Sequence, residues 1–159
     1  MNVDIICVGT LKEKYLREAD AEYRKRLSRF GKIAVTSVKE VKLPGKPSPA
    51  QEVAAIQEEG RAIIGRIGRR TFTIALDIKG KSLTSEGFAA EIAALQGSGV
   101  SSFTFIIGGS MGLSDEVLKE ADMRLSFSPM TFPHQLARII LEEQLYRACK
   151  INSGETYHK

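Results

Sequence analysis

Short apolar runs alternate with longer segments in which apolar residues recur every three or four positions. The apolar runs predict β-strands at residues 3–8, 33–38, 71–76, 102–107 and 123–127. The periodic segments predict helices at residues 12–30, 49–67, 84–95, 115–121 and 134–151, with Val53 and Ile63 on the buried stripe of the second helix. Because strands and helices alternate, we expect an α/β fold with a mostly parallel sheet and helices on both faces.

Three loops follow predicted strands. Residues 77–82 form a polar turn and residues 108–112 are rich in glycine. Residues 128–133 contain two prolines, Pro129 and Pro133. Ligands of parallel sheets bind outside the carboxyl ends of the strands. We therefore expect the loops that begin near Asp77, Gly108 and Ser128 to line one pocket.

Each loop also has a purely structural interpretation. The glycine turn matches neither the Walker loop nor Gly-x-Gly-x-x-Gly, and such turns are often plain strand-to-helix connections. Pro129 and Pro133 fix the backbone of the third loop, which could read an adenine edge with main-chain groups or simply form a rigid start for the last helix. Spacing alone leaves both alternatives open.

The composition is that of a globular protein. The chain has 159 residues, of which 43% are hydrophobic and 26% are charged, and we expect one domain over residues 1–159. No apolar run approaches the length of a membrane span, and the N-terminus lacks the features of a signal peptide, so we expect a cytoplasmic protein. Cys7 and Cys149 are interpreted as small buried hydrophobes, and no residues have metal-ligand spacing.

The net charge of +4 favours anionic partners. Basic residues are dense between Lys12 and Lys32, as in a surface that follows a phosphate backbone. The spacing of Glu22 and Arg26 equally fits an ordinary solvated helix face with ion pairs. Contact with RNA and a solvated face are both compatible with this segment.

Few residues are available for catalysis by the protein alone. His134 and His158 are the only histidines, and neither has a nucleophile motif beside it. The chemistry therefore points to a bound cosubstrate that carries the reactive group. His134 and Arg138 begin the last predicted helix, and the tail from Tyr157 could stack on a base if it folds back or reaches a neighbouring subunit.

Several motifs together resemble the RlmH family, the pseudouridine N3 methyltransferases of the large ribosomal subunit, which belong to the SPOUT class. The likeness spans the whole chain and rests on these segments: Val8-Gly9-x-Leu11-Lys12, Ile107-Gly108-Gly109-Ser110-x-Gly112, Leu125-Ser126-Phe127-Ser128-x-Met130-Thr131-Phe132-Pro133-His134-Gln135, Glu143-Gln144-Leu145-Tyr146-Arg147-Ala148 and Tyr157-His158-Lys159.

The resemblance implies a homodimer with a trefoil knot in the C-terminal half and a bent S-adenosylmethionine bound there. Neither the knot nor the dimer follows from periodicity. Carried over by position, the cofactor site comprises Leu76, Gly108, Phe127, Ser128, Pro129, Met130, Thr131 and Phe132. No metal and no membrane are implied.

The resemblance also implies the substrate, a pseudouridine in helix 69 of 23S rRNA, methylated at N3 in the assembled 70S ribosome. The proton on N3 must leave. His134 and His158 are the candidates for easing its loss, with Tyr157 and Arg138 as substrate contacts. Positioning of the reactants would supply most of the catalysis.

Two other classes compete with this interpretation. A basic α/β module that binds RNA without catalysis has the same composition, but it would not need the glycine turn together with the rigid proline-flanked loop. A conventional open Rossmann methyltransferase would carry a glycine fingerprint after its first strand, where only Gly9 stands.

Overall fold

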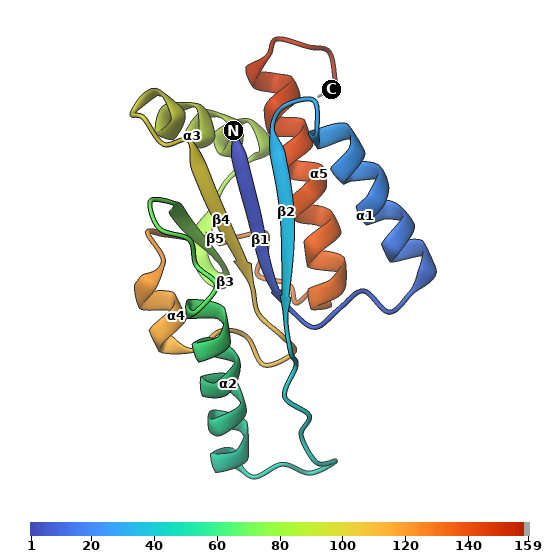
Figure 1. Ribbon diagram of the computed structural model, residues 1–159, viewed down its shortest axis with the longest axis vertical. Coiled ribbons are helices and arrows are strands. Elements are labelled where there is room, and N and C mark those ends of the chain that lie inside the picture. Colours follow the sequence, from blue (N-terminus) through green and yellow to red (C-terminus); the bar gives the residue numbers. More distant parts are fainter. Residues whose placement is uncertain (158–159) are drawn as a thin grey trace.

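The computed structural model describes residues 1–157, which form a five-stranded parallel sheet with helices on both faces (Figure 1). The strands are β1 (Asn2–Val8), β2 (Lys32–Val38), β3 (Phe72–Ser82), β4 (Ser102–Ile107) and β5 (Met123–Ser126). The helices are α1 (Lys14–Leu27), α2 (Pro49–Ile64), α3 (Ser85–Gly97), α4 (Asp115–Glu120) and α5 (His134–Asn152). The α/β class and the parallel sheet are confirmed.

The strand order is β2-β1-β4-β3-β5, and every neighbouring pair is parallel. All strands therefore end at the same edge of the sheet. β1 and β4 are central, with Val3 opposite Phe103 and Ile5 opposite Phe105. Their apolar side chains are buried on both faces, as is typical of parallel strands covered by helices.

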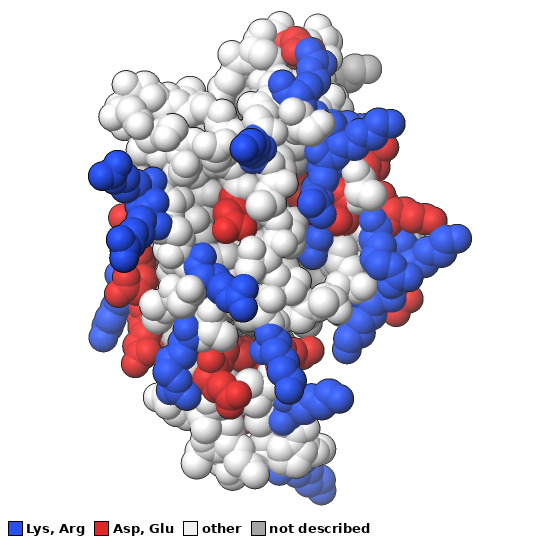
Figure 2. All heavy atoms as spheres, in the orientation of Figure 1, with Lys and Arg blue, Asp and Glu red and all other residues white. Residues whose placement is uncertain are grey.

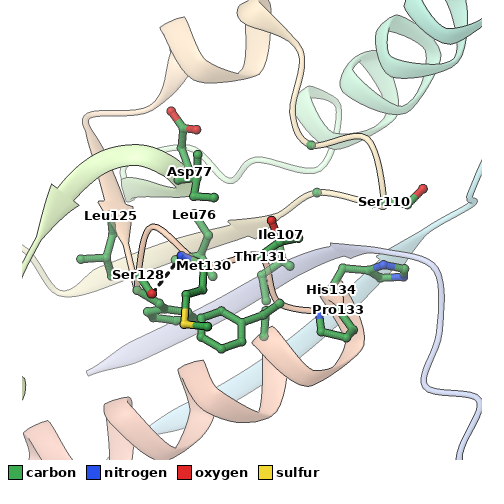
Figure 3. A pocket seen from close by; sticks show the side chains of 17 residues that line it. Leu76, Asp77, Ile107, Ser110, Leu125, Ser128, Met130, Thr131, Pro133 and His134 are labelled. Atoms are coloured by element: carbon green, nitrogen blue, oxygen red, sulfur yellow. Dashed lines mark hydrogen bonds between the residues drawn. The ribbon is translucent and has the colours of Figure 1, made fainter.

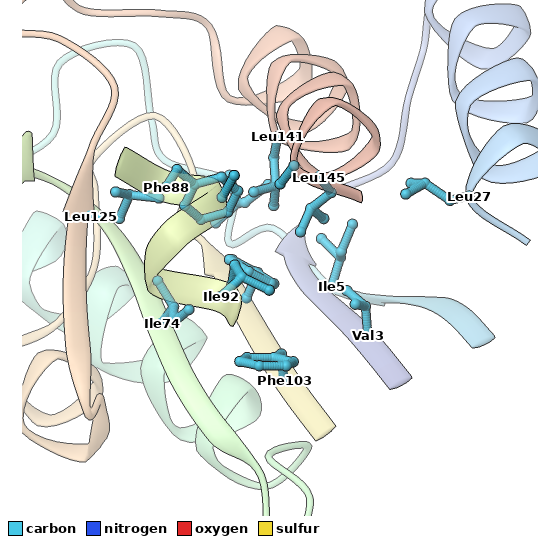
Figure 4. Packing of buried hydrophobic residues seen from close by; sticks show 14 of the residues in the cluster. Val3, Ile5, Leu27, Ile74, Phe88, Ile92, Phe103, Leu125, Leu141 and Leu145 are labelled. Atoms are coloured by element: carbon cyan, nitrogen blue, oxygen red, sulfur yellow. The ribbon is translucent and has the colours of Figure 1, made fainter. Parts of the chain in front are cut away.

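The larger core lies between the sheet and the layer of α1, α3 and α5. Leu141 and Leu145 of α5 point toward Val3 and Ile5 of β1, and Phe88 of α3 packs beside them (Figure 4). Both leucines are almost completely buried. Burial of side chains of this size stabilises the fold by about 1.5–3 kcal/mol each.

The opposite face carries a smaller core under α2 and α4, which includes Val8, Ile63 and Val117. Ser48 caps α2 through a capping box with Gln51, and Pro49 occupies its first turn, as expected for a helix start. The two helices approach closely at Gly60, where a Cβ atom would collide with Ser114 Oγ. The absence of a side chain at Gly60 therefore permits the close approach of α2 to the start of α4.

Some element boundaries differ from the prediction. β3 does not end before the predicted polar turn but continues to Ser82, with an irregularity between Leu76 and Lys81, after which it pairs again with β5. Backbone pairing at this point does not need apolar side chains. The first helix is shorter than predicted at both ends, and Val53 is 52% exposed rather than buried.

Candidate functional site

A cavity of about 620 Å³ opens at the carboxyl ends of β3, β4 and β5 and beside the start of α5 (Figure 3). The three predicted loops meet there. Its lining includes Leu76, Asp77, Ile107, Gly108, Ser128 and His134. The expected grouping of the loops near Asp77, Gly108 and Ser128 is therefore confirmed. The volume lies within the range of roughly 300–1,000 Å³ that small-molecule sites occupy.

The glycine turn forms one wall because its backbone folds tightly. A Cβ atom on Gly108 would lie only 2.6 Å from the carbonyl oxygen of Gly112. Gly112 itself has a φ of +81°, in the left-handed region that favours glycine, and its N–H donates to the carbonyl of Gly109 at 3.1 Å. Side chains at these positions would prevent the turn, so the glycines are required by geometry.

The proline-flanked loop forms a second wall. The Ser128 hydroxyl accepts a hydrogen bond from the Met130 N–H at 3.0 Å, drawn as the dashed line in Figure 3. Ser126 donates to the carbonyl of Ser128 at 3.3 Å. These local bonds hold the loop in shape. Met130 is 73% exposed and Phe132 37% exposed, so apolar surface remains available beside the cavity.

The irregular middle part of β3 supplies the third wall and its charged group. Asp77 and Ile78 line the cavity at the irregularity between Leu76 and Lys81. The Asp77 carboxylate lies 3.8 Å from an Arg124 nitrogen and accepts from the Lys79 N–H at 3.3 Å. Asp77 thus supplies the carboxylate of the cavity lining, an acceptor able to bind a hydroxyl or ammonium group.

All of the predicted cofactor residues except Pro129 line this cavity. His134 also lines it, through the first residue of α5. In Figure 3 the His134 ring points away from Met130, toward the side of the cavity nearest β1 and β2. The sequence interpretation missed Leu125 and Ala137, which complete the lining from β5 and α5.

Arg138 does not line the cavity, and its contact with substrate stays a prediction. Its side chain is 8% exposed and its guanidinium donates to Asp20 on α1 and to Glu142 one turn along α5. Burial raises the pKa of Glu142 to about 9, the Asp20 carboxylate acts in the same direction, and Arg138 partly opposes them. The cluster of Arg138, Asp20 and Glu142 joins α1 and α5 inside the protein.

Tyr157 lies against the middle of α5, away from His134. Its hydroxyl donates to Glu143 at 3.3 Å, and its ring packs against Tyr146 and Arg147. Glu143 is nine residues beyond His134, about 14 Å along the helix axis. A single chain therefore does not bring the two predicted residues together. His158 lies outside the described residues.

The basic segment on α1 is largely paired with acids. Lys14 contacts Glu18 at 3.6 Å and Arg26 contacts Glu22 at 2.7 Å. Acidic and basic side chains are mixed over α1, at the right of Figure 2. The structure favours a solvated face here, because cations that are already paired attract phosphates less strongly.

Comparison with known proteins identifies the family. A family model described as "Predicted SPOUT methyltransferase" matches residues 1–158. The chain belongs to the SPOUT methyltransferase family. The resemblance found in the sequence motifs is thereby confirmed, and the open Rossmann alternative is wrong.

Curated relatives of this SPOUT chain are similar over their full length. The proteins from Bifidobacterium animalis subsp. lactis and Carboxydothermus hydrogenoformans are 53% and 52% identical over 159 residues, covering 100% of both chains in each comparison. A relative from Exiguobacterium sp. is also 52% identical over its whole length. Each is named ribosomal RNA large subunit methyltransferase H.

The described residues of this SPOUT protein hold neither a metal-binding cluster nor a membrane-spanning helix. Residues 1–157 contain no group of three or more His, Cys, Asp or Glu side chains arranged to hold a metal ion. Within the same range no helix is both long and apolar enough to cross a membrane.

Proposed function

We propose that this protein transfers a methyl group from S-adenosylmethionine to ribosomal RNA of the large subunit. The finer proposal is methylation of N3 of a pseudouridine in helix 69 of 23S rRNA, in the assembled 70S ribosome. The observation that carries methyl transfer is the cavity in which three loops, distant in sequence, meet at the irregularity of β3 and the carboxyl ends of β4 and β5. The names of the full-length relatives support large-subunit ribosomal RNA as the substrate.

The cavity fits the proposed cofactor. Leu76 and the aromatic residues of the segment from Phe127 to Phe132 offer apolar walls for a flat adenine ring, and the backbone at Gly108 can approach a ligand closely. Asp77 can accept from a hydroxyl or an ammonium group. When bound, S-adenosylmethionine supplies an electrophilic methyl group.

The residues of the chain would act mainly by positioning the reactants and by accepting a proton. The N3 proton of the base must leave as the new N–C bond forms. His134 is the proposed acceptor among the described residues, because its ring lines the cavity. His158 is a second proposed acceptor, and Tyr157 a proposed substrate contact.

A homodimer would bring the tail that begins at Tyr157 to the cavity that His134 lines. Met130, Phe132 and Leu136 form exposed apolar surface around the start of α5, and a second copy of the chain would cover it. The tail that begins at Tyr157 would then contribute to the site of the neighbouring subunit. We further propose a single domain over residues 1–159, a trefoil knot in its C-terminal half and a location in the cytoplasm.

The test uses purified protein, radiolabelled S-adenosylmethionine and ribosomal particles that lack the modification. Naked 23S rRNA, isolated 50S subunits and 70S ribosomes are compared at equal concentration. We expect label in the RNA mainly with 70S ribosomes. Cofactor binding without transfer to any particle would reject the proposed substrate, and absence of cofactor binding would favour an RNA-binding protein without catalysis.

A further inference from the structure

The segment that leads from α2 into β3 is strongly basic. Residues 60–76 contain four arginines and neither lysine nor any acidic residue, so this segment carries a charge of +4, as large as the net charge of the whole chain. Arg66, Arg69 and Arg70 fall within five residues, and we call them the arginine patch. Their Cα atoms lie within about 14 Å of one another in any conformation of the chain.

The side chains of the arginine patch are exposed and unpaired. All three residues are exposed, and within residues 1–157 none of them forms an ion pair. The cations Lys14 and Arg26 of α1 differ, because each contacts a glutamate. Unpaired cations neutralise a polyanion more effectively than paired ones. The arginine patch, rather than α1, is therefore the surface that favours an anionic partner.

The patch lies at one side of the molecule. Figure 2 shows basic side chains gathered at the upper left, where the segment before β3 lies in Figure 1. Acidic side chains lie below them in the same view. An anionic partner would therefore approach at the start of β3, which is the amino-terminal edge of the sheet.

Arg70 has a backbone conformation that arginine rarely adopts. Its φ is +59°, and within residues 1–157 it is the only residue other than glycine with a positive φ. Glycine reaches this left-handed region without strain. Strained residues of this kind are concentrated at functional sites. Because the Arg70 side chain has no ion-pair partner within the described part of the chain, an external partner would explain its presence there.

The chemistry of the patch fits RNA phosphates. A guanidinium group binds phosphate oxygens through two parallel hydrogen bonds. A membrane is another common anionic surface, but proteins that lie on membranes also insert apolar side chains. None of the large hydrophobic residues that are exposed in residues 1–157 belongs to the segment 61–71. The patch therefore matches an RNA backbone better than a lipid surface.

The patch is separate from the cofactor cavity. β3 begins at Phe72, directly after the patch, and Leu76 of the same strand lines the cavity. Four residues of extended strand span about 13 Å. Phosphates that contact the arginines therefore belong to a part of the RNA other than the base that enters the cavity.

We propose that the arginine patch binds the phosphate backbone of an RNA double helix at a place separate from the methylated base. This inference rests on the proposed function for the identity of the polyanion, and it adds a contact that the residues of the cavity do not provide. A double helix presents phosphates at high density. The contact is independent of sequence, because phosphates carry no base identity.

The test measures binding of a fluorescein-labelled RNA duplex without pseudouridine by fluorescence anisotropy, with no cofactor present. Affinity is measured at several KCl concentrations. For the variant that combines Arg66→Gln, Arg69→Gln and Arg70→Gln, we expect a shallower slope of log affinity against log salt. The change should be about 2–3, because each lost phosphate contact removes about 0.9.

Single variants provide a control that is matched in charge. Arg69→Gln should reduce the salt slope by about 1. Lys14→Gln removes the same charge from an exposed ion pair on α1 and should leave the slope nearly unchanged. Equal changes in the two variants would overturn the inference, because net charge alone would then explain the binding.

Arg70→Gly distinguishes an RNA contact from a structural role. It should weaken duplex binding, while the midpoint of urea denaturation rises or stays the same, because glycine relieves the strain at this φ. A lower midpoint with unchanged duplex binding would show a structural role and overturn the assignment of Arg70.

Three further outcomes would overturn the whole proposal. These are absence of duplex binding, an unchanged salt slope in the triple variant, and tighter binding to vesicles of phosphatidylcholine and phosphatidylserine than to the duplex. The assay involves no methyl transfer, so it is independent of the proposed reaction. Transfer to ribosomes with an unchanged slope would reject the patch alone. A reduced slope without transfer to any particle would support the patch and reject the reaction.

Discussion

The guanidinium of Arg138 on α5 donates to the carboxylate of Asp20 on α1 at a point where both residues are buried. Arg138 stands four residues after His134, on the same side of the helix. The pair therefore fixes the part of α5 that carries His134 into the cavity. A residue that resembled a substrate contact in the sequence serves in the structure to join two helices.

Removing Arg138 should destabilise the protein strongly. Arg138→Ala removes the buried cation from between Asp20 and Glu142 and leaves Asp20 with only the partly exposed Arg24 at 3.6 Å. We expect the free energy of unfolding to fall by about 3 kcal/mol, the lower end of the range for a broken buried pair. Urea denaturation measures this free energy of unfolding. Lys14→Ala is the control, because Lys14 and Glu18 form an exposed pair whose loss should cost at most about 1 kcal/mol. Similar losses in both variants would contradict this account of the cluster.

Glu142 should make stability depend on pH. Its folded-state pKa of about 9 lies above the ordinary value, so the folded protein binds a proton that the unfolded chain releases between about pH 4.5 and 9. Stability from this group is complete below that window and is lost as the pH rises through it, by up to about 1.4 kcal/mol per pH unit. Glu142→Gln should remove this slope in denaturation curves measured from pH 5 to 9. Parallel curves for the two proteins would refute the assignment.

The glycine turn should tolerate no side chain at its first position. Gly108→Ala places a Cβ atom against the carbonyl of Gly112, and overpacking of this kind costs about 1–3 kcal/mol. We expect binding of S-adenosylmethionine to weaken about tenfold or more by isothermal titration calorimetry. Gly97→Ala is the control, since nothing lies within 4 Å of a Cβ atom there. Unchanged binding by Gly108→Ala would exclude the turn from the cofactor site.

His134 should affect the chemical step more than cofactor binding. For His134→Ala we expect the single-turnover rate of methyl transfer to fall by about 10²–10⁴, the range typical of general-base catalysis. Calorimetry with S-adenosylmethionine should show nearly unchanged affinity. A near-normal rate would reject His134 as the proton acceptor, and the same measurement on His158→Ala then tests the second proposed acceptor.

The exposed apolar surface around α5 should support the homodimer. Met130 is 73% exposed, and Met130→Asp would place a charge in the proposed interface. We expect sedimentation to show dissociation to monomers. Val53→Asp is the matched control, because Val53 is exposed on α2, on the other face of the sheet, and should leave the dimer intact. Dimers in both variants would place the interface elsewhere.

Much of the fold follows from the sequence because the spacing of apolar residues reflects which side chains are buried. Val3 and Phe103 lie in apolar runs that predict strands, and Ser114 and Pro49 mark helix starts that the structure confirms. The extension of β3 to Ser82 was not predictable in this way. Its polar residues pair with β5 through the backbone, which leaves no apolar signal.

The three-loop cavity was predictable because strand ends of a parallel sheet meet at one edge. The role of Arg138 was not predictable, because its partner Asp20 lies on a helix more than one hundred residues earlier in the chain. The sequence indicates the burial of Glu59 only weakly. This residue stands four residues after the buried Ala55 and four before the buried Ile63, so helical periodicity places a carboxylate on the apolar stripe. A carboxylate at such a position departs from the amphipathic pattern and needs a polar partner, which the Val41 N–H supplies.

The central claim is tested most directly by identifying the methylated nucleoside. Large-subunit RNA from ribosomes lacking the modification is treated with the protein and S-adenosylmethionine, digested to nucleosides and analysed by mass spectrometry with fragment mapping. The account predicts 3-methylpseudouridine in the helix 69 fragment, formed by the unsubstituted protein and greatly reduced with Gly108→Ala. Methylation of a ribose, of another base, or of no nucleoside at all would contradict it.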